Sequence, residues 1–375
     1  MDFIHEFYIN KNLSLLKKIT LIIPTFNRNY YFSRCLWYHA HFPFGEIIVA
    51  DSSSDAKKMV NQKIVAKVRE MFGTNIRYLE YEQETEKYGK DIYRKWGDAV
   101  QHVTTDYSII TTDKQFVFPL TLVLLTEFLY EHPDYNSAES KKIWIDKDFN
   151  GQTYFIPNGD SRFSVSITFD DSIERYKFAL QYGTDTLFML YRNEDHKKIY
   201  NYLMNSSVSD LRFAEMYLNI IPYIFGKSYF LDSKISLCRD MIHLNRNGKL
   251  NVLESSTVRY PSLYTYKKDG VYDKFYQNYK NSLLMLCNGI EVIDPMNIKN
   301  KMSLQNILLS NPKLMSVWQN IPKKLRMVMK QITGYTDTKI ENISDEMMIV
   351  DRLVNQTNKF HNLDEPILGD DLLKK

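Results

Sequence analysis

Short apolar runs alternate with amphipathic stretches along the first third of the chain. Residues 19–24 form an apolar run that is too short for a helix, is rich in β-branched residues and ends in proline, so they predict a buried strand. In residues 30–41 apolar side chains recur every three to four positions, which predicts an amphipathic helix. Residues 46–50 repeat the strand pattern. The fold is therefore expected to begin with a strand, a helix and a second strand.

The same alternation continues along the chain and predicts a parallel sheet. Two further helices are expected at residues 56–72 and 88–103, and two further strands at 76–81 and 107–111. Strands joined by helical crossovers run parallel, and such sheets hold ligands beyond the carboxyl ends of their strands. The functional loops are therefore expected at residues 25–29, 51–55 and 112–116.

The pattern changes after about residue 136, where a second half is expected to shape the site of a partner substrate. Its short strands are expected at residues 142–145, 154–157 and 163–168, and its helices near 173–181 and 210–218. Beyond about residue 245 helices are expected at 273–287, 303–309, 313–319, 322–332 and 344–356. We therefore expect one domain over residues 1–245, with a donor half at about 15–135 and an acceptor half at about 136–245, followed by a mostly helical extension over 246–375.

Composition supports a globular protein with a sizeable core. The chain has 375 residues, of which 44% are hydrophobic and 25% charged, and this matches ordinary soluble domains. Its net charge of +3 gives no reason to expect nucleic-acid binding. Its three cysteines form no Cys-x-x-Cys pair, which argues against a zinc ribbon or a disulfide framework. No apolar run is long enough to span a bilayer, and the first residues include acids where a signal peptide would be basic, so a cytoplasmic protein is expected.

Two segments carry a resemblance to a known family. Residues 22–28 read Ile-Ile-Pro-Thr-Phe-Asn-Arg, and residues 47–53 read Ile-Ile-Val-Ala-Asp-Ser-Ser. Up to about residue 245 the chain resembles the GT-A glycosyltransferases related to family 2, and among them a bacterial subgroup of surface-polysaccharide transferases. The resemblance implies an α/β fold of the GT-A type, which is Rossmann-like with a mostly parallel sheet flanked by helices, here with a helical C-terminal extension.

The first two loops carry candidate donor-binding residues. Thr25, Asn27 and Arg28 follow the first strand, where a guanidinium can bind a diphosphate or a sugar carboxylate bidentately. Asp51 and Ser52 follow the second strand, where Asp51 can accept hydrogen bonds from a base or a ribose. Alternatively, these residues only build a turn and cap the next helix. Because both loops follow neighbouring strands of one sheet and would converge on one crevice, donor binding is the preferred interpretation.

The third loop departs from the family pattern. The resemblance implies a cluster of aspartates that holds a divalent cation against the donor diphosphate, whereas residues 111–115 read Thr-Thr-Asp-Lys-Gln. Asp113 is the only acid of this loop and thus its only candidate ligand for Mg²⁺ or Mn²⁺, and metal-independent catalysis is the alternative. Thr112 and Lys114 are further candidate donor-binding residues. Lys114 either supplies positive charge where a metal otherwise would or is a solvated lysine. Few acids would also suit a nucleoside monophosphate donor, such as a CMP-linked ulosonic acid.

An inverting transferase needs a base that removes the proton of the acceptor hydroxyl. The resemblance implies that this acid lies on a helix of the second half, followed by Gly-Lys. The segment Ser-Asp-Leu-Arg-Phe-Ala-Glu at 209–215, with Gly-Lys at 226–227, fits that pattern. Glu215 is the candidate base, and Asp113 is the second candidate catalytic residue. Alternatively, Asp210 caps the helix and Glu215 is a solvated helix residue.

Further residues match family positions around the cleft. Arg239 matches a family arginine and is expected to bind phosphate, and His243 is either a second phosphate contact or a structural histidine. Tyr182 and residues 188–192 resemble a strand that borders the acceptor pocket, although core packing explains the apolar members equally well. Residues 313–330 mix apolar and basic positions, which predicts either a surface that contacts a membrane or a helix packed on the main domain.

Together these features predict an inverting glycosyltransferase, either a hexosyl- or an ulosonic-acid transferase, acting in bacterial surface polysaccharide synthesis. Its expected partners are a nucleotide-sugar donor and a glycan or lipid-linked acceptor. Its expected location is the cytoplasm or the inner face of the cell membrane. Two alternatives stay open from the sequence: a nucleotide-binding phosphotransferase or nucleotidyltransferase-like enzyme, and a non-catalytic nucleotide-binding relative.

Overall fold

The computed structural model describes most of the first 240 residues and parts of the remainder. The described residues are 3–8, 10–83, 87–147, 152–157, 165–182, 186–240, 261–287, 292 and 344–356. Several expectations lie outside these residues, namely His243, the helices at 303–309, 313–319 and 322–332, and the basic segment 313–330.

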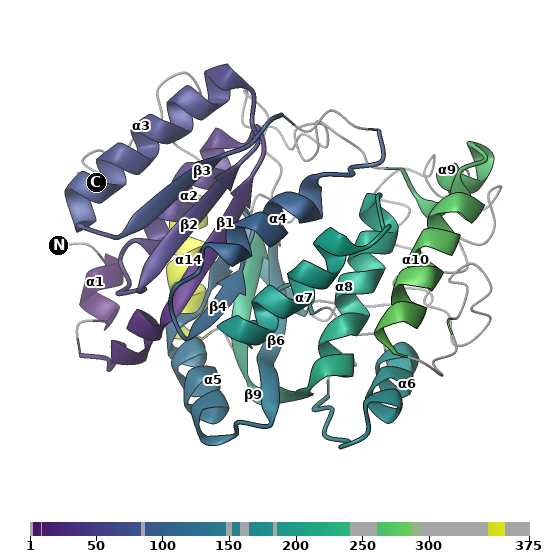
Figure 1. Ribbon diagram of the computed structural model, residues 1–375. Helices are drawn as coiled ribbons and strands as arrows, with labels where there is room; N and C mark the ends of the chain where they lie inside the picture. The colour runs from purple at the N-terminus through teal and green to yellow at the C-terminus, as the bar shows by residue number, and fades with distance from the viewer. Residues whose placement is uncertain are drawn as a thin grey trace.

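A nine-stranded sheet forms the centre of the described part of the chain (Figure 1). Its strands are β1 (Ile19–Thr25), β2 (Glu46–Asp51), β3 (Ile76–Glu80), β4 (Tyr107–Ile110), β5 (Gln115–Val117), β6 (Tyr135–Lys147), β7 (Thr153–Pro157), β8 (Leu190–Arg192) and β9 (Lys227–Asp240). Their order is β3-β2-β1-β4-β8-β6-β9-β5, with β7 paired to β6. β1 to β4, β6 and β9 point in one direction, and β5, β7 and β8 point in the other. The predicted α/β fold, with a mostly parallel sheet flanked by helices, is confirmed.

Helices cover both faces of this sheet. They are α1 (Phe3–Tyr8), the 3₁₀ helix η1 (Ser14–Lys18), α2 (Asn29–His39), α3 (Asp55–Phe72), α4 (Ile92–Gln101), α5 (Pro119–Glu131), α6 (Ser172–Tyr182), α7 (Asn193–Asn205), α8 (Leu211–Phe225), α9 (Leu263–Lys268), α10 (Tyr272–Leu286) and α14 (Asp345–Gln356). In Figure 1, α4, α7 and α8 lie on the face of the sheet turned toward the viewer, and α14 lies behind it. Among the helices that the structure describes, none has the length and apolar character that crossing a bilayer requires.

The parallel half of the sheet is buried on both faces. Every residue of β1 and β2 is buried, as expected of parallel strands between two helical layers, and this is why these strands read as continuous apolar runs. The chain passes from β1 outward to β2 and β3 and then returns to β4 on the other side of β1. The carboxyl ends of β1 and β4 therefore flank the point at which strand order reverses, where open α/β sheets bind ligands.

Most elements expected in the first 240 residues are present, with shifted ends. The expected strands at 142–145 and 154–157 lie within β6 and β7. The described part of 163–168 instead contributes a single bridge between Ile167 and Ser228. The sequence pattern predicts no element for α5 or α7. In α5 apolar side chains predominate on all sides, so the helical period is weak in the sequence.

The described helices of the expected extension pack against the preceding residues. Phe213 of α8 lies in a cluster of tyrosine rings from α9 and α10, with ring centroids 5.4 Å from Tyr279 and 5.6 Å from Tyr272. α14 buries one apolar face, formed by Met347, Val350, Leu353 and Val354. The proposed boundary near residue 245 stays a prediction.

A carboxylate of α14 completes the start of α5. The backbone N–H of Leu120 donates to Glu346 Oε1 at 3.4 Å, and the Tyr8 hydroxyl donates to the same oxygen at 2.9 Å. α5 begins at Pro119 without a side-chain cap from its own N-cap residue, so the acid that serves its first turn comes from far along the chain. Burial raises the pKa of Glu346 to about 7.

Candidate functional site

The first two loops are joined to each other at the carboxyl ends of β1 and β2. The backbone N–H of Asn27 donates to Ser53 Oγ at 2.8 Å, and the backbone N–H of Ser54 donates to Asn27 Oδ1 at 2.9 Å. Asn27 has a φ of 55°, a left-handed conformation that asparagine tolerates better than most residues. The predicted donor loops therefore meet, and Asn27 acts as the turn that the sequence offered as an alternative.

The first loop also reaches the third. The Thr25 hydroxyl donates to Asp113 Oδ2 at 2.9 Å, and Arg28 Nη1 lies 3.2 Å from Asp113 Oδ1. The Asp113 side chain is 2% exposed and that of Arg28 is 30% exposed, so the ion pair runs from the interior toward solvent. Three residues predicted to bind the donor or to act in catalysis are thus in direct contact.

Asp51 faces away from that contact. Its Oδ1 accepts from the backbone N–H of Ser53 at 2.7 Å, and its Oδ2 accepts from Asn61 Nδ2 at 2.7 Å and from the Tyr78 hydroxyl at 2.5 Å. The residue is fully buried. These bonds tie the second loop to α3 and β3, and binding of a base or ribose by Asp51 stays a prediction. Burial raises the pKa of Tyr78 well above its ordinary value, so its hydroxyl remains a donor.

A lysine that sequence reasoning missed bridges the first two strands. Lys95 on α4 donates from Nζ to Ser52 Oγ at 2.8 Å and to the Thr25 carbonyl at 3.2 Å. It is buried, on the helix face that also buries Tyr93 and Trp96. A lysine within the apolar stripe of an amphipathic helix was the signal that could have found it, because burial of an ammonium requires polar partners.

The third loop presents Lys114 beside Asp113. The Lys114 ammonium lies 4.0 Å from the centre of the Tyr31 ring, at cation–π distance. Burial lowers the pKa of Lys114 to about 8, although Asp240 and Asp113 oppose this shift. The backbone N–H of Thr112 donates to Gln115 Oε1 at 2.8 Å, so Thr112 helps to close the turn.

The end of β9 forms the wall beside this turn. Arg239 lies opposite Gln115 in the antiparallel pairing of β5 and β9. The backbone N–H of Asp240 donates to the Lys114 carbonyl at 2.7 Å, and the Asp240 carboxylate forms a buried ion pair with Arg34 of α2. The sequence did not predict a role for Arg34 either. Like Lys95, it is a charged residue on a buried helix face, which is the pattern that could have identified it.

The described side chains do not fit a divalent cation at the third loop. Both carboxylate oxygens of Asp113 already accept from Thr25 or Arg28. Within the described ranges no three His, Cys, Asp or Glu side chains are grouped so that they could hold a metal ion. The cation that the family resemblance implies would have to compete with the Arg28 guanidinium for the Asp113 carboxylate.

The candidate base lies on α8. Glu215 Oε2 is 3.3 Å from Arg212 Nη1, and each side chain is 37% exposed. Asp210 caps the helix, accepting from the backbone N–H of Phe213 at 3.0 Å, which agrees with the capping alternative. Burial raises the pKa of Asp210 to about 6. The backbone N–H of Leu211 donates to the Tyr88 carbonyl at 2.8 Å, so α8 starts beside the loop that leads into α4.

Arg192, from the segment expected to border an acceptor pocket, does not lie beside the predicted donor loops. Arg192 donates from Nε to the Tyr135 carbonyl at 2.8 Å and from Nη2 to the His132 carbonyl at 3.0 Å. Its partner across β4 is Tyr107, the first residue of that strand. Arg192 therefore lies at the edge of the sheet opposite to the donor loops, because β8 runs antiparallel to β4. The Tyr182 side chain is outside the described part.

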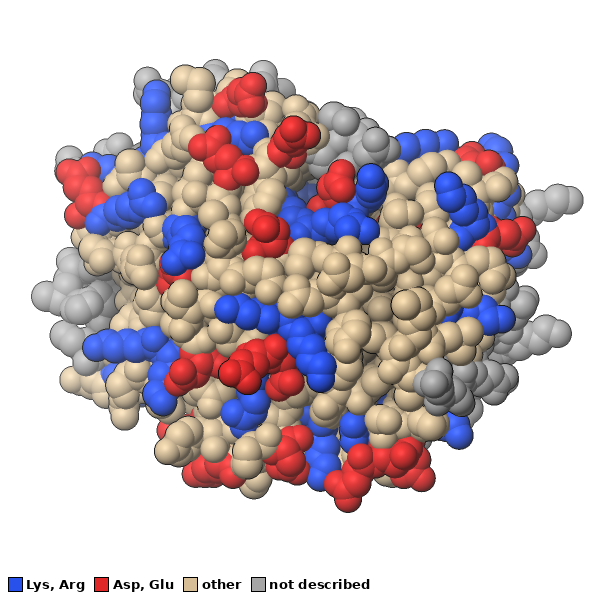
Figure 2. All heavy atoms as spheres, viewed as in Figure 1, with Lys and Arg blue, Asp and Glu red and all other residues tan. Residues whose placement is uncertain are grey.

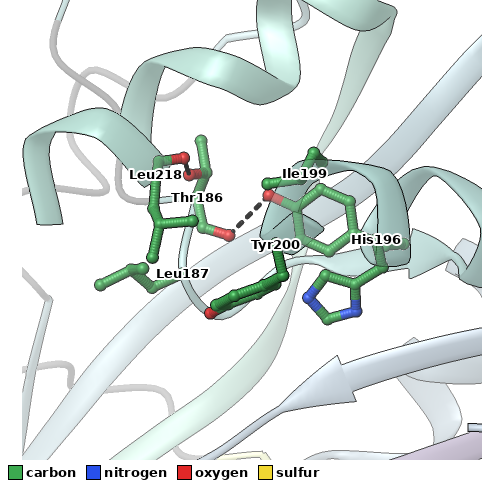
Figure 3. Close-up of a pocket in the computed structure, with 7 residues that line it drawn as sticks. Thr186, Leu187, His196, Ile199, Tyr200 and Leu218 are labelled. Carbon is green, nitrogen blue, oxygen red and sulfur yellow. Dashed lines mark hydrogen bonds between the residues drawn. The ribbon is translucent and has the colours of Figure 1, made fainter. Parts of the chain in front are cut away.

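A cavity of about 10 Å³ lies between the sheet, α7 and α8 (Figure 3). It is lined by Thr186, Leu187, Tyr191, His196, Ile199, Tyr200 and Leu218. His196 Nδ1 is 2.7 Å from Ser108 Oγ, and burial lowers the pKa of His196 to about 3. This histidine is a neutral structural residue, and the cavity has room for about one water molecule.

The face shown in Figure 2 carries basic and acidic side chains next to each other, without a field of one sign across it. A protein that binds nucleic acid through this face would be expected to gather its lysines and arginines.

No family model and no curated protein matches the chain. Solved structures of TarS from S. aureus are similar to it. One is 15% identical with a TM-score of 0.41, and the alignment covers 93% of this chain and 54% of that one, so the chain spans about half its length. A structure of TarS 1-349 in complex with UDP-GlcNAc is 14% identical with a TM-score of 0.40, and 93% of this chain and 92% of that one are covered.

Proposed function

We propose that the chain is a glycosyltransferase that moves a sugar from a nucleotide-sugar donor to a glycan or lipid-linked acceptor, with inversion at the anomeric carbon. The observation that carries this proposal is the meeting of three loops at one edge of the sheet. Arg28 and Thr25 of the first loop contact Asp113 of the third, and Lys95 joins Thr25 to Ser52 of the second. This edge lies at the reversal of strand order, where α/β sheets hold nucleotides.

The charge of this edge suits an activated sugar. Its basic side chains, Arg28, Lys95, Lys114 and Arg239, come from four different segments of the chain. Guanidinium and ammonium groups are the usual protein partners of phosphate. Hydroxyl groups at the same edge, from Thr25 and Ser52, suit the polar atoms of a ribose or a sugar.

The proposed reaction is a single displacement. The acceptor oxygen forms a bond to the anomeric carbon, and the bond from that carbon to the phosphate oxygen breaks, with its electron pair leaving on the phosphate. A carboxylate on the acceptor side takes the proton of the acceptor hydroxyl. Glu215 is the proposed base, because it is partly exposed on a helix that starts beside the loop leading into α4. Asp210 is the second carboxylate near the start of this helix. Substituting Glu215 and Asp210 one at a time shows which of them is the base.

The proposed setting is bacterial surface polysaccharide synthesis, in the cytoplasm or at the inner face of the cell membrane. The support for this setting is the family resemblance of residues 22–28 and 47–53. The acceptor half would then meet a growing glycan or a lipid-linked sugar.

The test is a donor screen with the full chain. Thermal shift with UDP, GDP, CMP, dTDP and UDP-GlcNAc identifies the nucleotide, since a ligand at 100 times its Kd stabilises the folded state by about 2.7 kcal/mol. Release of the free nucleotide from its sugar conjugate, measured with and without candidate glycans, then reports transfer. Stabilisation by one nucleotide family together with sugar transfer is the expected result.

Two other results would contradict the proposal. Consumption of a nucleoside triphosphate with release of pyrophosphate would indicate a nucleotidyltransferase. Nucleotide binding without any transfer, over a wide panel of sugars and acceptors, would indicate a binding protein that lacks the reaction.

A further inference from the structure

We propose that this site binds the phosphate groups of its donor directly through Lys114, Arg28 and Arg239, with no divalent cation between protein and phosphate, and that Asp113 is a positioning residue. The inference rests on the proposed function and specifies the chemistry of the same site. It departs from the expectation that the family resemblance carries, in which acids of the third loop hold a metal.

The contacts of Asp113 are the first support. Its two oxygens accept from the Thr25 hydroxyl at 2.9 Å and from Arg28 at 3.2 Å, and the residue is almost completely buried. The acid therefore compensates the guanidinium and fixes the orientation of Thr25. A carboxylate used in this way holds the first loop against the third.

The balance of charge is the second support. Among the described residues, Asp240, Arg28, Asp113 and Arg239 lie close enough to Lys114 to influence its pKa, and Asp240 is itself paired with Arg34. This cluster thus contains four basic and two acidic side chains. An excess of positive charge attracts a phosphate and repels a divalent cation.

The rigidity of the turn that carries Lys114 is the third support. The backbone N–H of Asp240 fixes the Lys114 carbonyl at 2.7 Å. Three side chains of α2 form hydrogen bonds with the backbone of β5, the strand that follows the turn. The Cys35 thiol donates to the Gln115 carbonyl at 3.5 Å, and the Tyr38 hydroxyl donates to the Val117 carbonyl at 3.2 Å. His39 Nε2 accepts from the backbone N–H of Val117 at 3.2 Å.

A lysine held in this way can do the electrostatic work of a metal. Negative charge develops on the phosphate oxygen when its bond to the sugar breaks, and a preorganised ammonium or guanidinium stabilises that charge. No reorganisation of the turn is required at that moment. The phosphate can belong to a nucleoside diphosphate or to a nucleoside monophosphate, which share this chemistry.

The experiment is binding calorimetry on the full chain after dialysis against EDTA. The probes are inorganic pyrophosphate, UDP, GDP and CMP, each titrated in EDTA and again with Mn²⁺ in excess. Lys114→Gln removes the proposed phosphate contact. The matched control is Lys18→Gln, which removes the same charge from a lysine that pairs with Asp106 just before β4, at the opposite edge of the sheet, and whose side chain is 44% exposed.

We expect at least one nucleotide to bind in EDTA with a Kd within about threefold of its value in Mn²⁺. Lys114→Gln should weaken this binding by about tenfold or more, and Lys18→Gln by less than about twofold, since a charge-assisted contact to phosphate contributes much more to binding than a distant, exposed charge. Lys114→Arg keeps the charge and should retain most of the binding, which separates loss of a contact from loss of folding.

Asp113→Asn distinguishes positioning from metal binding. If Asp113 is a metal ligand, Asp113→Asn should abolish the binding that depends on Mn²⁺. If Asp113 is a positioning residue, Asp113→Asn should lower kcat, because Arg28 and Thr25 lose their orientation. The Kd of pyrophosphate should then change by less than about threefold, because the added positive charge of the site offsets that loss of orientation.

The outcomes separate the two proposals. Nucleotide binding that requires Mn²⁺, or binding in EDTA that Lys114→Gln leaves intact, would overturn this inference and leave the proposed function standing. Absence of binding for every nucleotide, with or without Mn²⁺, would overturn both.

Discussion

The donor loops and the start of α8 both bury carboxylates, but they compensate them differently. In the donor region Asp113 lies against Arg28, and Asp240 lies against Arg34. At the start of α8, Asp210 is held by a backbone N–H, and burial raises its pKa to about 6. With a pKa near 6, Asp210 can exchange a proton near neutral pH. The two regions thus differ in how they hold a buried acid: the first pairs it with an arginine, and the start of α8 raises its pKa.

The largest expected effect separates binding from chemistry. Glu215→Gln should lower kcat by about 10²-fold to 10⁴-fold, because a general base contributes about that much, and should leave the Kd of the nucleotide within about twofold. Lys114→Gln should instead raise the Kd of the nucleotide by about tenfold or more. Steady-state kinetics and calorimetry on the two variants provide the measurement. A Glu215→Gln variant with full turnover would move the base to another residue, with Asp210→Asn as the next variant to measure.

The second largest effect concerns the buried pair behind the third loop. Arg34→Met should destabilise the fold by about 3 to 5 kcal/mol, because it leaves Asp240 buried without its guanidinium. Urea denaturation followed by circular dichroism measures the difference. The control is Lys141→Met, which removes the cation of an ion pair with Asp232 whose side chains are 45% and 77% exposed, and which should cost less than about 1 kcal/mol. Equal losses in both variants would show that burial does not decide the strength of these pairs.

The third effect is the pH dependence of the α8 start. Because folding raises the pKa of Asp210 from 3.8 to about 6, the folded state binds its proton more tightly than the unfolded state does. Its contribution to stability is full below about pH 4 and is lost as the pH rises through 6, by about 3 kcal/mol in total. Asp210→Asn should remove this part of the slope, as measured by urea denaturation between pH 4 and 8. An unchanged slope in the variant would assign the pH dependence to other groups.

The smallest effect concerns the turn that joins the first two loops. Asn27→Ala should destabilise the fold by about 1 to 2 kcal/mol, because alanine is strained at positive φ and cannot accept from the Ser54 N–H. Asn27→Gly loses the same hydrogen bond without the strain, so it should cost less than Asn27→Ala. Thermal denaturation of both variants measures the difference. If Asn27→Gly destabilises the fold as much as Asn27→Ala does, the loss comes from the missing hydrogen bond and not from strain at positive φ.

The positions of the first two loops were predictable from the sequence. A buried parallel strand is apolar throughout and its loop follows directly, so the strands ending at Thr25 and Asp51 locate the loops proposed to bind the donor. The contact of Arg28 with Asp113 follows from the same rule, because carboxyl ends of parallel strands meet. These features need only local pattern and the parallel topology.

Residues that reach the site from helices were not predictable in this way. Lys95 and Arg34 occupy buried faces of α4 and α2, and only the packing of those helices brings Lys95 to Ser52 and Arg34 to Asp240. Arg192 was expected near the cleft but lies at the far edge of the sheet, because β8 runs antiparallel to β4. A short strand gives no sign of its direction in the sequence, so pattern alone could not place it.

The carboxylate of Glu346 has a consequence for how the protein is made. It joins α1 near the beginning of the chain to α5 through α14, so these contacts form only after residue 346 has been synthesised. A ribosome adds about 5 to 20 residues each second, and during that time the apolar surface that receives Met347, Val350 and Leu353 stays exposed to water. Nascent chains stalled ahead of this helix should therefore be the ones that chaperones hold and proteases cut.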